Sequence, residues 1–357
     1  FFFIIMDLED LFCYNLDMVN NMKSVNYIKI NTQNILDNLK YMKNNYLYPN
    51  YIANVSNHAF SHGMYLIKML SEYIDYLYVN HFDDLLMIRK YNQNIPVIYD
   101  GEIHEDNIYD LIINNAILVI HDFGVLQNIR NLNIKDNLSF IFYVDPAGYV
   151  GICNKQDILD FLEWDNQHLE CLGVMAHLNE KNYDDFKYII RPIANSKLMI
   201  LNFEEDKRKI HSSNAILLDQ SIYGINQIKK KLFQKSDTPL KQAFSLYSKV
   251  ICVKEEVHNK KNKYIAVIPF GYHHGMNDAI KNVYIKDKLY PVVEIFNEFA
   301  YILVDERINK DMEVEITSEN NPLENYFSNQ ALNYFSLFNS NIVIVYDDYI
   351  LEKMLIY

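Results

Sequence analysis

The sequence predicts an α/β protein in which a (β/α)8 barrel of the TIM type is followed by a mostly antiparallel β domain. Between residues 51 and 222, short apolar runs typical of buried strands alternate with stretches of helical periodicity. Beyond Gly224, strand-like runs follow one another closely with no helical stretch between them. Half of the 357 residues are apolar, which is ample for two hydrophobic cores.

The first element with a clear pattern begins after residue 24. Residues 1–23 show no strong periodicity and are expected to form an N-terminal extension. Tyr27–Ile30 alternates as a strand does, and Asn31 and Thr32 are suited to cap the helix that follows. The apolar stripe of this helix consists of Ile35, Leu36, Leu39 and Met42.

Eight apolar runs and the helical stretches between them predict the barrel. The strand runs are Tyr51–Val55, Tyr76–Val79, Ile95–Tyr99, Ala116–Ile120, Ser139–Val144, Cys171–Ala176, Leu198–Leu201 and Ala215–Ile222. Helical spacing occurs in Met64–Ile74, Asp84–Lys90, Ile108–Ile113, Phe123–Ile129, Ile158–Trp164 and Tyr183–Ile190. Strands buried on both faces and joined by helices are typical of parallel sheets. Eight of them favour a closed barrel, with a doubly wound open sheet as the alternative.

The remainder of the chain predicts a second domain. Its strand runs are Ala243–Val253, Tyr264–Pro269, Asn282–Ile285, Tyr290–Ile295, Ala300–Val304 and Met312–Ile316. Short turns without intervening helices indicate antiparallel pairing. We therefore assign residues 24–240 to the barrel and residues 241–357 to the β domain, and we expect the first strand, residues 26–30, to join the β domain.

Composition narrows the kinds of partner and compartment. The net charge of −13 and isoelectric point of about 5.3 argue against nucleic acid and anionic membranes as general partners. The cysteines form no C-x-x-C pair, which suits a reducing compartment. No run is long enough to span a membrane, and Phe1–Met6 is too short for a secretion signal. We expect a cytoplasmic protein.

The carboxyl ends of the predicted strands carry polar residues that can do chemistry. In a barrel of this type such ends meet at one mouth. They are Ser56, His81, Asp100, His121, Asp145, His177, Asn202 and Asp219. Histidines and carboxylates of this kind can bind a metal or act as acid and base. Because no two of them have a close ligand spacing, we predict no metal site.

The segment after the first barrel strand, N-V-S-N-H-A-F-S-H-G at residues 54–63, resembles V-V-K-A-N-A-Y-G-H-G of the alanine racemases. In that family the lysine forms the Schiff base with pyridoxal phosphate (PLP), and here Ser56 stands in its place. His58 replaces the asparagine and Phe60 the tyrosine, whereas His62 and Gly63 are kept. The resemblance thus implies the family's fold without its catalytic amine.

Further segments resemble the same family and lose the same kind of residue. In Y-V-D-P-A-G-Y-V-G-I, residues 143–152, Asp145 is kept while Tyr149 stands at the arginine that would hold the substrate carboxylate. In G-V-M-A-H, His177 matches the histidine that lines the cofactor ring. In L-M-I-L-N-F, Asn202 is kept and Phe203 replaces the serine that binds phosphate.

The last two segments also keep some residues of the family and replace functional ones. In L-L-D-Q-S-I-Y-G, Tyr223 is kept, Leu217 replaces the arginine that faces the pyridine nitrogen, and Asp219 replaces the glycine whose N–H contacts the phosphate. In P-F-G-Y-H-H-G, Tyr272 matches a residue at the substrate entrance. The segment that carries the family's second catalytic base, a tyrosine, has no counterpart between Val253 and Tyr264.

These losses predict a pseudoenzyme: a catalytically inactive homologue that binds no PLP and acts as a dimeric binding, regulatory or scaffolding protein. The resemblance implies a head-to-tail homodimer, with a small-molecule ligand or protein partner left open. The candidate pocket consists of His58, Phe60, Asp145, Tyr149, His177, Asn202, Phe203, Leu217, Asp219, Tyr223 and Tyr272. The alternative is an amino-acid racemase or isomerase with a rebuilt site that uses another lysine, a metal, or His58, His177 and Asp145. A repressing heterodimer with an active racemase is a third reading.

Overall fold

The chain forms two compact units. The computed structural model describes residues 25–132, 134–164, 168–203, 213–224, 240–258, 261–323, 326 and 343–347. One unit is Met42–Asp219, and the other combines Phe1–Tyr41 with Gln220–Tyr357. The division thus follows Asp219, earlier than the boundary after residue 240 that the change of pattern suggested. The predicted N-terminal extension, residues 1–23, lies outside the described residues.

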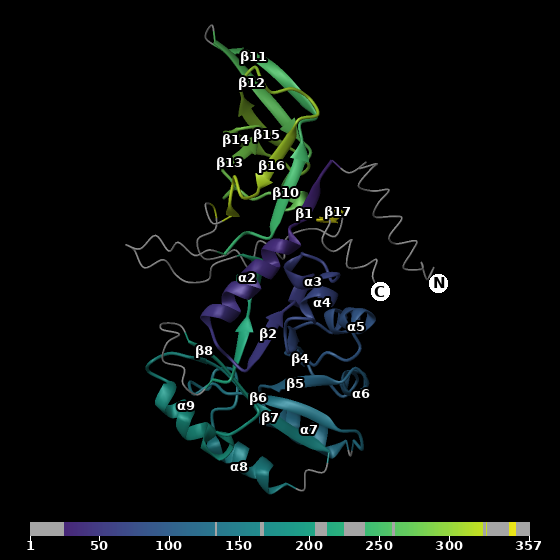
Figure 1. Ribbon diagram of the computed structural model, residues 1–357, viewed down its shortest axis with the longest axis vertical. Coiled ribbons are helices and arrows are strands. Elements are labelled where there is room, and N and C mark those ends of the chain that lie inside the picture. Colours follow the sequence, from purple (N-terminus) through teal and green to yellow (C-terminus); the bar gives the residue numbers. More distant parts are fainter. Residues whose placement is uncertain are drawn as a thin grey trace, which may run out of the picture. The chain divides into compact units, whose positions relative to one another are not determined.

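The first unit is a closed barrel of eight strands, in which every neighbouring pair is parallel (Figure 1). The strands are β2 (Asn50–Asn54), β3 (Tyr76–Val79), β4 (Val97–Tyr99), β5 (Ala116–Ile120), β6 (Leu138–Tyr143), β7 (Leu169–Leu178), β8 (Leu198–Phe203) and β9 (Ala215–Leu218). All eight predicted strands are present, and β2 pairs with β9 to close the ring. The predicted barrel is confirmed, and the open-sheet alternative is wrong.

Helices connect the strands and lie outside the ring (Figure 1). They are α3 (Ser56–Phe60), α4 (Leu66–Leu70), α5 (Phe82–Tyr91), α6 (Ile108–Ile113), α7 (Phe123–Asn131), α8 (Lys155–Glu163), α9 (Tyr183–Ile190) and the 3-10 helix η1 (Arg191–Ile193). Their buried apolar residues, such as Leu126 and Ile129 of α7, recur at helical spacing. No helix in the described ranges is both long and apolar enough to cross a membrane.

The barrel interior is filled by aliphatic side chains from alternate strand positions. Its cluster contains Ile52, Ile98, Ile117, Val119, Ile141, Met175, Leu198, Ile200 and Ala215. Gly173 of β7 allows the neighbouring strand to approach, because a Cβ at this position would lie 1.7 Å from the carbonyl oxygen of Leu198. The interior is therefore a packed core, and a ligand can enter the ring of strands only at its ends.

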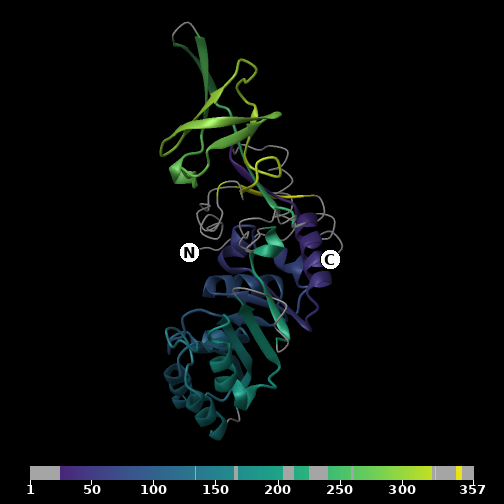
Figure 2. The same cartoon turned by 90° about the vertical axis from the view of Figure 1, so that its left-hand side faces the viewer.

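The second unit contains a nine-stranded sheet in the order β11-β12-β15-β14-β13-β16-β10-β1-β17, antiparallel except for the parallel pair β1–β17. Figure 2 shows most of its strands in green to yellow. Its elements are β1 (Tyr27–Ile30), the part of α2 (Thr32–Asn45) up to Tyr41, η3 (Gln220–Tyr223), β10 (Phe244–Lys249), β11 (Cys252–His258), β12 (Lys261–Ile268), η4 (Tyr272–His274), β13 (Asn282–Ile285), β14 (Lys288–Ile295), β15 (Ala300–Val304), β16 (Glu313–Thr317) and β17 (Val343–Tyr346). The predicted antiparallel domain is confirmed.

Two predicted strands differ from the structure, one in the sheet unit and one at the end of the barrel. The run Ala243–Val253 forms two strands, because β10 pairs with β1 and β16 whereas β11 pairs with β12. The run Ala215–Ile222 ends as a strand at Leu218, and Gln220–Tyr223 continues as the 3-10 helix. In both cases a continuous apolar run conceals the point at which the chain changes its hydrogen-bonding partner.

Helix α2 begins and packs as its sequence indicates. The Asn31 side chain accepts a hydrogen bond from the backbone N–H of Asn34 at 2.9 Å, which caps the helix. Asn38 is buried and joins the helix to two segments of the same unit. Its amide donates to the carbonyls of Ile222 and Lys241, and its oxygen accepts from the Lys241 N–H.

Candidate functional site

Strand alternation sets a ring of polar side chains at the carboxyl end of the barrel. Successive side chains of a strand point to opposite faces, so residues two apart share one face. Ile98, Val119 and Met175 belong to the barrel core, and Asp100, His121 and His177 follow two residues later. The same spacing adds Asn54, Ser56, Tyr78, Asn80, Tyr143, Asn202, Leu217 and Asp219. We call these residues the barrel mouth.

Asp100 is the centre of a hydrogen-bonded cluster in the mouth. The Tyr78 hydroxyl donates to Asp100 Oδ2 at 2.5 Å, and His121 Nε2 lies 2.5 Å from Oδ1. Because a carboxylate only accepts, His121 donates to Asp100 through Nε2–H. The ring of Tyr143 stacks on His121 with centroids 4.4 Å apart and lies 6.4 Å from the ring of His177. Side chains from five consecutive strands therefore meet here.

The cluster gives the mouth a negative electrostatic character. Burial, the charge of Asp100 and its hydrogen bond, and the charge of Asp219 raise the pKa of Tyr78 well above its ordinary range. Burial and the charges of Asp145 and Asp100 likewise raise the pKa of Tyr143. Both phenols consequently stay protonated at neutral pH and serve as hydrogen-bond donors.

Asp219, Asn54 and Ser56 form a second hydrogen-bonded chain in the mouth. The Asn54 amide donates to Asp219 Oδ1 at 2.9 Å, and Asn54 Oδ1 accepts from the backbone N–H of Ser56 at 3.0 Å. Ser56 is only 2% exposed, and its Oγ is buried without a hydrogen-bond partner among the described residues. Residue 56 is thus buried at the end of β2, where the resemblance would place the catalytic amine.

The segment after Ser56 has an uncommon backbone. Asn57, His58, Ala59, Phe60 and Ser61 all have φ between 51° and 63°, the left-handed region that costs an L-residue about 1–2 kcal/mol. Asp84 of α5, which is 2% exposed, accepts hydrogen bonds from the backbone N–H groups of Asn57 and His58 at 2.8 and 3.0 Å. This buried carboxylate therefore stabilises the turn that positions Ser56.

Phe60 and His62 fill the space beneath this turn. Phe60 is 4% exposed and His62 is 1% exposed. His62 Nδ1–H donates to the carbonyl oxygens of Ala59 and Phe60, each at 3.0 Å. Burial lowers the pKa of His62 to about 4, although these carbonyls oppose the shift. His62 is therefore neutral at physiological pH and acts as a structural residue.

Three other candidate residues do not point into a common pocket, because one bonds to its own loop and two are exposed. The Asp145 carboxylate accepts from the N–H groups of Ala147, Tyr149 and Val150, so it organises the loop after β6. Tyr149 is 89% exposed and does not fill the mouth. The His58 imidazole is also exposed, with Nε2 3.8 Å from Asp84 Oδ1.

The remaining candidates divide between the two units. Leu217 packs against the barrel core, and Asn202 lies opposite His177 in the strand register. The backbone of Phe203 ends β8, but its side chain lies outside the described residues. In the sheet unit, Tyr223 is fully buried, whereas Tyr272 is 44% exposed and its hydroxyl donates to Asp278 at 2.6 Å.

Sequence reasoning missed Tyr78 and Tyr143 as functional candidates. Both lie within apolar runs and were counted as strand core. Their inward position could have been found, because each lies two residues before a polar residue that follows its strand, Asn80 or Asp145. In the described ranges no group of three or more His, Cys, Asp or Glu residues is arranged to hold a metal ion.

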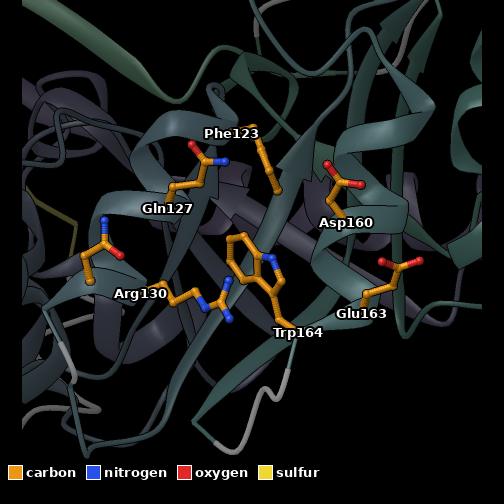
Figure 3. A pocket seen from close by; sticks show the side chains of 7 residues that line it. Phe123, Gln127, Arg130, Asp160, Glu163 and Trp164 are labelled. Atoms are coloured by element: carbon orange, nitrogen blue, oxygen red, sulfur yellow. The ribbon is translucent and has the colours of Figure 1, made fainter.

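A separate cavity of about 500 Å³ lies on the outer face of the barrel between α7 and α8 (Figure 3). Arg130 stacks over the ring of Trp164 at 4.4 Å, and the carboxylates of Asp160 and Glu163 lie across from it. Phe123, Gln127 and Asn131 complete the lining. Since its walls come from the outer helices, this groove is distinct from the barrel mouth.

Comparison with known proteins places the chain in a family. A family model described as the N-terminal domain of alanine racemase matches residues 30–227. The chain belongs to the alanine racemase family. The alanine racemase of Borreliella burgdorferi (strain ZS7) is 24% identical over 305 residues, which cover 74% of this chain and 80% of that protein.

Solved alanine racemase structures share the fold over nearly the whole chain. That from E. faecalis has a TM-score of 0.80 and 16% identity, covering 90% of this chain and 98% of its own. That from Bartonella henselae, described with covalently bound pyridoxal phosphate, has a TM-score of 0.75 and 14% identity, covering 90% of this chain and 99% of its own. The predicted family membership and fold are confirmed.

We predict that Asp84→Ala destabilises the protein by about 3 kcal/mol, because it removes the acceptor of two N–H groups of the left-handed turn and leaves a gap where a buried carboxylate lay. The measurement is urea denaturation followed by circular dichroism. Asp83→Ala, which removes an exposed carboxylate from the same helical turn, is the matched control. Equal stability of the two variants would show that the turn does not depend on Asp84.

A second prediction concerns pH. The pKa of His62 is about 4 in the folded chain, against an ordinary value of 6.5. The unfolded chain therefore binds the extra proton first, and stability falls as pH decreases from about 6.5 towards 4. We expect wild type to lose about 2 kcal/mol more than His62→Asn between pH 7 and pH 5. Parallel pH profiles in urea denaturation would contradict a neutral, buried His62.

Proposed function

We propose that this member of the alanine racemase family does not use PLP and acts by binding, as a dimeric regulatory, scaffolding or ligand-sensing protein. The observation that carries the proposal is the buried serine at the end of β2. A serine hydroxyl cannot form an imine with an aldehyde, so Ser56 cannot replace the family's lysine. The eight barrel strands, all of them described, contain no lysine or arginine. An alternative amine within these strands is therefore absent.

The polar groups of the mouth do not fit the cofactor's phosphate. A phosphate is close to dianionic and needs N–H groups, hydroxyls or cations around it. Here Asp219 occupies the position where the resemblance expects a glycine N–H, and it would bring a carboxylate against the phosphate. Phe203 removes a hydroxyl from the same cradle. The donor set supports the absence of PLP independently of Ser56.

A second candidate function is an enzyme with a rebuilt site. It is favoured by the cluster of Tyr78, Asp100 and His121, since a histidine bonded to a carboxylate is a common acid–base arrangement. His177, named from the sequence, lies beside this cluster through Tyr143. Asp145, by contrast, is engaged by three backbone N–H groups. Such an enzyme would therefore depend on His121.

The homodimer that the resemblance implies remains part of the proposal. The sheet unit exposes apolar side chains around η4 and β14, among them Val293 at 58% and Phe296 at 41%. Backbone hydrogen bonds join Tyr272 to Phe296 and Phe296 to Phe299, so these exposed rings form one corner. Apolar groups gathered in this way are typical of a protein interface.

We predict that the purified protein shows no internal-aldimine absorption band when incubated with PLP. Ser56→Lys restores only the amine, so it is also expected to show none, because the acidic mouth still opposes the phosphate. A band in wild type would overturn the proposed function. A band only in Ser56→Lys would leave it standing but refute the phosphate argument. Racemisation of alanine without PLP that is lost in His121→Ala would instead favour the enzyme.

We also predict that Val293→Asp raises the dissociation constant of a homodimer about tenfold or more, since it places a charge in an apolar contact. Light scattering over a dilution series measures the effect. Leu47→Asp, at a loop residue that is 88% exposed, is the control. A wild-type protein that is monomeric at every concentration would rule out the dimer, and an unaffected dimer would rule out this corner as its interface.

A further inference from the structure

Three buried polar atoms lack hydrogen-bond partners at the carboxyl end of the barrel. Among the described residues of the barrel unit, Ser56 Oγ, Asn80 Oδ1 and His121 Nδ1 have no hydrogen-bond partner. Asn80 and His121 come directly after β3 and β5, so alternation points their side chains to the inner face. Ser56 lies two residues beyond β2 and is 2% exposed. A buried polar group without a partner is costly and needs an explanation. Their common place in the mouth indicates that a ligand completes them.

The hydrogen-bonding capacity of these atoms defines the ligand. Asn80 Oδ1 can only accept. His121 donates through Nε2–H to Asp100, and in the neutral imidazole Nδ1 then carries a lone pair and accepts. The Ser56 hydroxyl can do either. A partner that satisfies all three atoms must therefore supply hydrogen-bond donors.

The charge of the mouth also favours a ligand with donors, because it favours a cation. Asp100 and Asp219 each carry a carboxylate there, and Asp100 is 15% exposed. Among the described residues, Asp100 forms no ion pair with a lysine or arginine. Partly buried carboxylates attract a cation strongly and repel an anion, because little water screens them.

We propose that the barrel mouth binds a small organic cation bearing N–H donors, of which a primary ammonium group is the simplest. This inference rests on the proposed function, because a mouth that held PLP would need donors where these acceptors lie. The ammonium group donates to Asp100 or Asp219 and to the unpartnered acceptors. The site lies wholly within residues 42–219.

The test titrates the full-length protein with three probes by ligand-observed NMR. Ethylammonium carries both the charge and the N–H donors, tetramethylammonium carries the charge alone, and inorganic phosphate carries the opposite charge. We expect ethylammonium to bind at least about tenfold more tightly than tetramethylammonium, and phosphate not to bind. Asp100→Asn is expected to weaken ethylammonium binding about tenfold or more.

Asp136→Asn removes an exposed carboxylate before β6, at the opposite end of the barrel, and is expected to change nothing. If Asp100→Asn does not fold, Asp219→Asn gives the decision, since its side-chain oxygen can still accept from Asn54. Equal binding of tetramethylammonium, binding of phosphate, or ethylammonium binding that survives both substitutions overturns the inference. Absence of ethylammonium binding also overturns it, as the mouth then holds solvent only. The proposed function fails separately, through an aldimine band with PLP.

Discussion

The pairing of β2 with β9 is the constraint on which the candidate site depends. It closes the barrel and brings Asn54 and Asp219, 165 residues apart in sequence, into a hydrogen bond. Because all eight strands are parallel, closure also gathers their carboxyl ends at one mouth. Alternation then decides which side chains point inward. Inside the closed barrel, the apolar core requires no polar contact of its own. The ring of polar side chains at the mouth is a consequence of that closure.

The left-handed turn after Ser56 keeps its shape without help from the side chain of residue 56. Its bonds run between backbone groups, the Asp84 carboxylate and the His62 ring. None of them involves the side chain of residue 56. A lysine can therefore be exchanged for a serine while the turn keeps its shape. This explains how residues 54–63 can match the racemase segment at Val55, Ala59, His62 and Gly63 while Ser56 stands at the position of the lysine.

The ligand that we propose for the mouth differs in charge from pyridoxal phosphate. Asp100 and Asp219 supply negative charge, and the unpartnered atoms nearby accept hydrogen bonds. The phenols of Tyr78 and Tyr143 stay protonated, so they carry no charge that could cancel that of the carboxylates. A dianionic phosphate gains little in such surroundings, whereas an ammonium group gains both charge and hydrogen bonds.

The sequence by itself determined the barrel and the second sheet, and it predicted that Ser56 stands in place of the family's lysine. Hydrophobic periodicity is local, so each strand and helix could be located without knowledge of its neighbours. Ser56, Asp100 and His121 could likewise be placed at strand ends. Only the tertiary structure decided that Tyr78 and Tyr143 join Asp100 and His121, that Asp145 serves its own loop, and that Tyr149 lies in solvent. These outcomes depend on side-chain contacts between neighbouring strands and on loop geometry, which no local pattern encodes.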